Sequence, residues 1–253
     1  MNEGVTKEIE IRANPIILTG EQVKSYDDNG YLIVPDVFSD EACERMKKEA
    51  GPMSDGKEYH AVLNIHRKND LFLKIVKDPV LVSMVKTIQR HKVVALNDQY
   101  FFKRAGTPYA RQAWSPHQDV TYIGAGDGTY IQLHIFLVKN EKENGGLYYY
   151  PGSHKETKLP YEYRKSWREE FDENGISHPG WKIHEVPSKY QRVDIVGPKG
   201  GICFQHGNII HGSYANLSRD RGREQYSIAY LNEGEKFVMQ GRSSVKIPVP
   251  LEP

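Results

Sequence analysis

The sequence of 253 residues contains only two cysteines, Cys43 and Cys203, and no excess of charge of either sign. Two cysteines cannot build a disulfide framework or a cysteine-based zinc ribbon. The 34 basic residues nearly balance the 33 acidic ones, so the electrostatic argument for a nucleic-acid or polybasic membrane partner fails. No apolar run approaches the roughly 18 residues of a membrane span, and residues 1–15 lack the apolar stretch of a signal peptide. We therefore expect a cytoplasmic protein without nucleic-acid or membrane partners.

Helical patterns come first along the chain, and strand patterns follow. Thr19 and Gln22 have the spacing of a capping box, and the Asn-Gly pair at 29–30 is a helix-stop signal. Further helices are expected over 39–50, 70–76 and 79–90. Short apolar strands broken by glycine and proline turns then follow, at 93–103, 131–138, 147–150, 201–205 and 226–231. We expect one mainly β domain with helical support over 1–253, its core a sandwich or barrel and residues 1–18 a polar arm.

A charged and aromatic insertion at 155–200 interrupts the strands. Long loops in a compact domain are usually functional lids or disordered segments. Aromatic side chains such as Tyr161, Tyr163 and Trp181, together with nearby cations, suit a lid over a small polar or anionic substrate. A solvated surface helix over about 161–170 is the other interpretation, and both stay open at this point.

His117 and Asp119 form a His-x-Asp pair, which is the local half of a 2-His-1-carboxylate iron site. Residues two apart on a strand point to the same side, so both side chains can reach one ion. A competing pair, His154 and Glu156, follows a Pro-Gly turn, where strand geometry does not align the two side chains. We therefore favour His117 and Asp119 as ligands.

Two histidines, His206 and His211, are candidates for the distant third ligand. They are five residues apart, so on one strand they would face opposite ways and only one could bind the metal. Either could instead be a packed or hydrogen-bonded structural histidine.

Three arginines after these histidines could bind the far carboxylate of a 2-oxo acid that chelates the metal, since Arg offers a bidentate fork. Arg223 leads directly into an apolar strand pattern, whereas Arg219 and Arg221 lie among the Ser, Asp and Gly of a solvated turn. Arg223 is the favoured clamp, and Arg221 is a minor alternative.

Taken in order, these segments resemble the phytanoyl-CoA dioxygenase (PhyH-like) family of iron(II)/2-oxoglutarate oxygenases. The resemblance covers roughly residues 19–231 and is strong because every part occurs in order and at the right spacing. It rests on GYLIVP at 30–35, SPHQD at 115–119, NGGL at 144–147, PGSHK at 151–155, and HGS at 211–213 followed by Asn216 and Arg223. Arg223 lies about one residue beyond the usual distance from His211.

The resemblance implies a double-stranded β-helix (jelly-roll) core with helical support, in which His117, Asp119 and His211 bind iron(II). It implies that Arg223, helped by Ser213, binds the C5 carboxylate of 2-oxoglutarate, with Lys103 near the cosubstrate at the end of its strand. Strand parity places Gln99 on the same side as Lys103. Candidate substrate contacts are Asn97, Trp181 and His134, which stands where the family often carries an aromatic residue such as Trp.

The implied reaction consumes O2, decarboxylates 2-oxoglutarate to succinate and CO2, and most often hydroxylates a C–H bond of a small molecule, with ascorbate supporting activity in vitro. Asp119 fills the position that related halogenases replace with a small residue, which argues against chlorination. Two alternatives are a cupin-type metal dioxygenase that does not use 2-oxoglutarate and a non-catalytic member that binds metal or ligand. The oligomeric state has no signal in the sequence.

Overall fold

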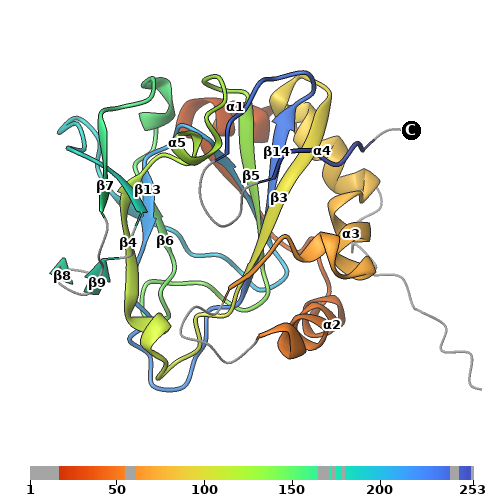
Figure 1. Cartoon of the computed structure of the whole chain (residues 1–253), viewed down its shortest axis with the longest axis vertical. Helices are drawn as coiled ribbons and strands as arrows, with labels where there is room; N and C mark the ends of the chain where they lie inside the picture. The colour runs from red at the N-terminus through yellow and green to blue at the C-terminus, as the bar shows by residue number, and fades with distance from the viewer. Residues whose placement is uncertain are drawn as a thin grey trace, which may run out of the picture.

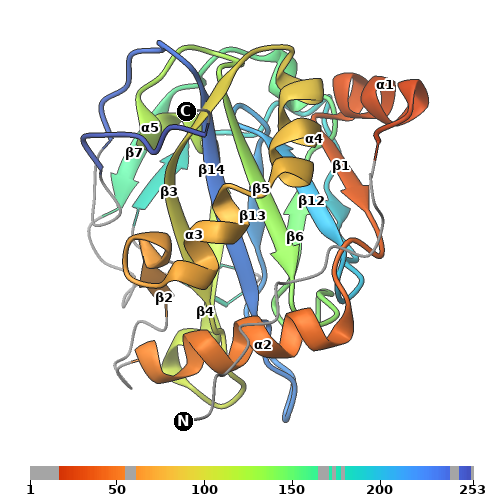
Figure 2. The same ribbon diagram turned by 90° about the vertical axis from the view of Figure 1, so that its right-hand side faces the viewer.

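Two six-stranded sheets and a set of N-terminal helices form three layers (Figures 1 and 2). The structure is a computed structural model, and it describes residues 17–54, 61–164, 171–172, 175–177, 180–239 and 245–251. The first sheet has the strand order β1-β12-β5-β14-β3-β2, and the second has the order β11-β6-β13-β4-β9-β8. This arrangement confirms the mainly β, jelly-roll class with helical support.

The helices begin and end where local signals predict. The predicted capping box is present, since the side chains of Thr19 and Gln22 each accept a bond from the other's backbone, and Gly30 ends the helix in the left-handed region at φ 81°. Side chains of Ser39, Asn69 and Asp78 cap the next three helices. The helices are α1 (Gly20–Asn29), α2 (Asp40–Ala50), α3 (Asp70–Val76), α4 (Pro79–Gln89) and the short α5 (Val120–Ile123), with 3-10 turns η1 (Gly51–Met53), η2 (Ile65–Arg67), η3 (Pro108–Arg111) and η4 (Ser153–Lys155).

Among the strands that the structure describes, pairing is antiparallel except between β4 and β9. The first sheet consists of β1 (Tyr31–Val34), β2 (Ala61–Leu63), β3 (Val93–Phe101), β5 (Tyr130–Phe136), β12 (Ile202–His206) and β14 (Gln225–Asn232). The second consists of β4 (Gln112–His117), β6 (Leu147–Tyr149), β8 (Phe171–Asp172), β9 (Gly175–Ser177), β11 (Val193–Asp194) and β13 (His211–Ser213). The predicted strand over 93–103 is too long, because β3 ends at Phe101 and Lys103 has a left-handed φ of 32°.

The first sheet has one face against the helices and the other toward the second sheet, as the alternation along β5 predicts. Ile131, Leu133 and Ile135 join a core cluster with side chains of α3 and α4, and Figure 2 shows both helices lying over β3, β14 and β5. On the other face, Phe136 packs with Tyr149 of the second sheet. The other face of β5, which carries Gln132 and His134, is therefore directed into the space between the two sheets.

The insertion contains a two-stranded antiparallel sheet instead of the surface helix considered above. β7 (Tyr161–Arg164) pairs with β10 (Gly180–Ile183), and Trp181 lies opposite Tyr163 in the register. The helical interpretation is therefore wrong for residues 161–164. The physical reason for the strand is that Tyr163 and Trp181 lie opposite each other, and aromatic pairs across two strands stabilise a sheet. Residues 165–170 of the considered helix lie outside the described residues.

Most of the predicted N-terminal arm, residues 1–16, lies outside the described residues. Leu18, at the end of the predicted arm, is already buried in the core. None of the helices in the described ranges is both long and apolar enough to cross a membrane.

Candidate metal centre and cosubstrate site

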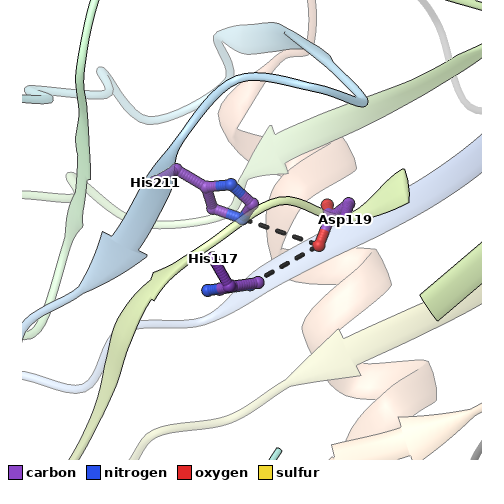
Figure 3. A group of neighbouring side chains, drawn as sticks. All are labelled: His117, Asp119 and His211. Carbon is purple, nitrogen blue, oxygen red and sulfur yellow. Dashed lines mark ion pairs between the residues drawn. The ribbon is translucent and has the colours of Figure 1, made fainter. Parts of the chain in front are cut away.

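Two histidines face each other from neighbouring strands of the second sheet. His117 is the last residue of β4, His211 is the first of β13, and the two are direct partners in the antiparallel register. Cross-strand partners point to the same side of a sheet, so the ring centroids lie only 4.2 Å apart. Figure 3 shows both rings directed toward Asp119.

Asp119 reaches the two histidines by a route other than the one predicted. It does not continue the strand but has helical backbone angles, φ −63° and ψ −31°, at the start of α5. The intervening Gln118 points elsewhere, with its Nε2 donating to the Asn208 carbonyl at 2.8 Å. The turn after β4 brings Asp119 Oδ1 to 3.5 Å from His117 Nε2 and 3.6 Å from His211 Nε2. Strand alternation was therefore the wrong reason for a pair that the structure does bring together.

Backbone contacts of the two histidine rings occupy Nδ1 and place Nε2 as the ring nitrogen nearest to Asp119. The Nδ1 of His117 lies 2.8 Å from the Ser115 carbonyl, and the Nδ1 of His211 lies 3.1 Å from the Ile209 carbonyl. A carbonyl accepts a hydrogen, so each ring carries its proton on Nδ1 and keeps an acceptor lone pair on Nε2, as in known metal-ligand histidines. The Nε2 of His211 also lies 3.2 Å from Gln205 Nε2. One ligand atom from each of the three residues lies within 4.8 Å of the others. This donor set fits iron(II) bound on one face.

The protonation states also suit a metal. Burial lowers the pKa of His211 to about 3. Burial alone would raise the pKa of Asp119, but His211 and His117 outweigh it and lower the pKa to about 2. Metals bind neutral imidazole and ionised carboxylate, so at neutral pH neither of these two side chains needs to lose a proton before binding.

The rival histidines lie away from this cluster. His206 ends β12 of the first sheet whereas His211 begins β13 of the second, so the argument from facing directions on one strand does not apply. The His206 ring packs against Tyr26 and His154, and its Nδ1 accepts a hydrogen bond from the backbone of Asn208 at 3.0 Å. The structure therefore groups His211, and not His206, with Asp119.

The arginines divide as their sequence surroundings predict. Arg223 is 3% exposed and lies just before β14; its Nε donates to the Gly145 carbonyl at 3.1 Å and its Nη1 to Gln225 Oε1 at 2.9 Å. Arg221 is exposed and pairs with Glu141 on the surface. Arg223 is thus placed to meet an anion inside the protein, and Arg221 is not.

Lys103 lies beside Arg223 in the interior, beyond the end of β3. Its Nζ donates to the Tyr214 carbonyl, to Ser213 Oγ at 3.3 Å and to the Gly145 carbonyl at 3.4 Å, and all three acceptors are neutral oxygens. Burial and the nearby Arg223 hold the pKa of the Lys103 ammonium well below its ordinary value. The Arg223 guanidinium and the Lys103 amine share the Gly145 carbonyl and form a site for a carboxylate, with the Ser213 hydroxyl within reach.

Binding of 2-oxoglutarate is expected to be accompanied by proton uptake, of up to about one proton, at pH values above the lowered pKa of Lys103. An incoming carboxylate favours the charged ammonium and raises its pKa, so the proton is taken up between the free and bound pKa values. Calorimetric titration of the metal-loaded protein in two buffers of different ionisation enthalpy measures this uptake. Uptake that persists in Lys103→Met would refute the assignment to Lys103.

Two further predicted residues lie on β3. Gln99 is half-buried and pairs with Ser227, which places it on the face toward the second sheet. Asn97 lies at a register shift opposite β14 and is 3% exposed. No group among the described residues hydrogen-bonds its buried Oδ1. Their roles toward cosubstrate and substrate stay predictions.

Trp181 connects the insertion to the metal centre. Its ring stands edge-on to those of Tyr161 and Tyr163, with centroids 5.0 and 5.1 Å away, and its backbone N–H donates to Tyr122 Oη at 2.8 Å. The Tyr122 ring in turn meets the His117 ring edge-on at 5.9 Å. The two-stranded sheet of the insertion therefore lies one side chain away from a candidate ligand.

The sequence analysis missed Gln205, which joins the candidate ligands to His134. Gln205 is fully buried and its Nε2 lies 2.7 Å from Asp119 Oδ2, while its Oε1 lies 3.0 Å from His134 Nε2. A signal was available, because an amide that follows Ile202, Cys203 and Phe204 in a buried strand needs a buried partner. The predicted substrate contact His134 has both ring nitrogens within hydrogen-bond distance of protein groups.

Comparison with known protein sequences gives one family match and several relatives. The sequence model of the family described as phytanoyl-CoA dioxygenase (PhyH) matches residues 26–224. An ectoine dioxygenase of Stutzerimonas stutzeri (strain A1501) is 26% identical over 226 residues, covering 79% of this chain and 73% of the relative. Phytanoyl-CoA dioxygenase 1 of Oryza sativa subsp. japonica is 27% identical over 228 residues, covering 89% and 74%.

Solved structures share the fold at low sequence identity. The epimerase SnoN, in complex with Fe3+, alpha-ketoglutarate and nogalamycin RO, superposes with a TM-score of 0.73 at 16% identity, covering 92% of this chain and 95% of that one. EctD from S. alaskensis with bound Fe gives a TM-score of 0.66 at 17% identity, covering 96% and 90%. At these identities the likeness concerns the fold alone.

Proposed function

The chain belongs to the phytanoyl-CoA dioxygenase (PhyH) family of iron(II)/2-oxoglutarate-dependent oxygenases, and we propose that it hydroxylates a C–H bond of a small-molecule substrate. The observation that carries the site assignment is the grouping of three ligand atoms, one from each of His117, Asp119 and His211, within 4.8 Å of one another. Hydroxylation is the usual outcome when the carboxylate position of the triad is filled, as it is here by Asp119.

In this proposal His117, Asp119 and His211 hold the iron. Bound together, iron and 2-oxoglutarate supply the activation of dioxygen, with decarboxylation of 2-oxoglutarate to succinate and CO2. The protein contributes position and charge. The buried Arg223 and Lys103 attract the C5 carboxylate, which Ser213 and the guanidinium fork can orient.

The carboxylate of Asp119 has a second task in the proposed reaction. With iron bound, Asp119 would fill the position that a halide takes in related halogenases, which favours transfer of oxygen to the substrate carbon. Because Gln205 Nε2 lies 2.7 Å from Asp119 Oδ2, Oδ1 is the oxygen that would hold the metal.

We also propose that the insertion at 155–200 is a lid over the substrate and that the chain is one domain. The support is the contact from Trp181 through Tyr122 to the ring of His117. The insertion presents Tyr161 and Tyr163 at the surface, 39% and 53% exposed, and these suit a small molecule with polar and apolar parts. Two of the relatives are named for small-molecule substrates, ectoine and phytanoyl-CoA.

A screen of small metabolites tests this function. The protein, with iron(II), ascorbate and 2-oxoglutarate under air, is expected to form succinate in step with a substrate product one oxygen atom heavier. A product that forms without 2-oxoglutarate would favour the cupin-type alternative. Tight binding of iron and 2-oxoglutarate without substrate-dependent succinate across the screen would favour the non-catalytic alternative.

A further inference from the structure

A network of buried hydrogen bonds leads away from the candidate metal centre, beginning at Gln205, whose Nε2 contacts Asp119 and also lies 3.2 Å from His211 Nε2. Asp119 Oδ2 lies 2.7 Å from Gln205 Nε2, whereas Oδ1 is the oxygen nearest to His117 and His211. Gln205 has no exposed surface. The amide therefore occupies one carboxylate oxygen and leaves the other for the metal.

The network continues from Gln205 to His134, which is 6% exposed. Gln205 Oε1 lies 3.0 Å from His134 Nε2, and His134 Nδ1 lies 2.8 Å from both Ser227 Oγ and Gln225 Nε2. Gln225 Oε1 accepts from Arg223 Nη1 at 2.9 Å. The side chains between the candidate ligand and the candidate clamp are thus joined without a gap.

The hydrogen bonds from Asp119 through Gln205 to His134 each have a fixed donor and acceptor. An ionised carboxylate only accepts, so Gln205 must donate through Nε2, and its Oε1 must then accept from His134. His134 therefore carries its proton on Nε2 and accepts on Nδ1 from Ser227 or Gln225. The pKa of His134 is lowered to about 4 by burial, which keeps the ring neutral in this tautomer at neutral pH.

We propose that His134 and Gln205 are positioning residues that set the orientation of the Asp119 carboxylate, so that a single oxygen, Oδ1, meets the metal. The inference rests on the proposed function, because it concerns the same metal centre. A hydrogen bond to the outer oxygen restricts rotation of the carboxylate about its Cβ–Cγ bond. His134 in turn holds the Gln205 amide in the orientation that directs Oε1 toward His134 and Nε2 toward Asp119.

The proposal also accounts for a departure from the family pattern. Where the resemblance implies an aromatic residue such as Trp, this chain has His134, and the register places it directly between Cys203 of β12 and Ser227 of β14. An indole there has a single N–H donor and no acceptor, so it could not both donate to Gln205 and accept from Ser227. His134 fills the position and satisfies both neighbours.

Titration with Mn(II), in the absence of 2-oxoglutarate, tests the positioning role with a readout other than turnover. His134→Phe and Gln205→Met are each expected to weaken Mn(II) binding by about 10- to 100-fold, the usual cost of losing an outer partner of a metal ligand. His134→Gln, which keeps a donor toward Gln205, is expected to stay within about threefold of the unmutated protein. The double variant is expected to bind no more weakly than Gln205→Met alone, because His134 acts through Gln205.

His206→Phe is the matched control, since it exchanges the same residue types on β12 outside the hydrogen-bond network, and it should leave Mn(II) affinity unchanged. Circular dichroism of each variant identifies any that does not fold; if His134→Phe fails, Gln205→Met and His134→Gln carry the test. Unchanged affinity in His134→Phe, equal weakening in His134→Gln, or additive losses in the double variant would overturn the positioning role. Absence of Mn(II) binding by the unmutated protein would instead overturn the proposed metal centre.

Discussion

Replacement of Asp119 by alanine is expected to abolish iron binding at micromolar metal and, with it, formation of succinate. Asp119 Oδ1 is the only negatively charged member of the three candidate ligand atoms, and it lies within 3.6 Å of both imidazole Nε2 atoms. Its loss leaves two neutral imidazoles to bind a divalent ion. The decrease in affinity should therefore exceed the roughly 10- to 100-fold that loss of an outer hydrogen-bond partner causes. Calorimetric titration with anaerobic Fe(II) measures the affinity directly.

Two histidine variants complete this experiment. His211→Ala should lose metal as Asp119→Ala does, whereas His206→Ala should retain it, because the His206 ring packs against Tyr26 and His154 away from the cluster. The opposite result for the two histidines would reverse the ligand assignment. Normal iron affinity in Asp119→Ala would show that the metal binds elsewhere.

Replacement of Arg223 by alanine should weaken 2-oxoglutarate binding by about 2–5 kcal/mol, roughly 30- to several-thousand-fold, as expected when one partner of a buried charged pair is truncated. Arg223 is 3% exposed and its guanidinium is held by Gly145 and Gln225, so it is already oriented before the cosubstrate arrives. Metal affinity measured without 2-oxoglutarate should change much less. Anaerobic titration of the iron-loaded protein with 2-oxoglutarate, followed by absorption of the iron chelate, gives the affinity.

Arg221→Ala is the matched control, because Arg221 pairs with Glu141 at the surface and exposed ion pairs contribute little. It should bind 2-oxoglutarate normally. Arg223→Lys keeps the charge but loses the planar fork, so an intermediate affinity is expected. Unchanged affinity in Arg223→Ala would exclude Arg223 as the clamp.

The helices and most strands were predictable because their signals are local. The capping box of Thr19 and Gln22 and the left-handed Gly30 act within one turn of helix, and the alternation along β5 records which face meets the helices. The extent of β3 and the pairing of β7 with β10 were not predictable, because strand ends and cross-strand partners depend on segments distant in the chain.

His117, Asp119, His211 and Arg223 were identifiable from residue types, order and spacing, yet the reasons that bring them together are tertiary. His117 and His211 meet through strand register, and Asp119 joins them through a turn into α5 and not through strand alternation. The choice of His211 over His206 follows from the two residues lying in different sheets.

The sequence by itself determined the family, the mainly β class and the candidate ligand types, since these depend on patterns within short segments and on their order. Only the tertiary structure decided how the ligands are oriented. Gln205 is 86 residues from Asp119 and 71 from His134 along the chain, and no local pattern specifies that such distant polar groups share one buried space. Their pairing arises because each buried donor and acceptor needs a partner once the two sheets close over them.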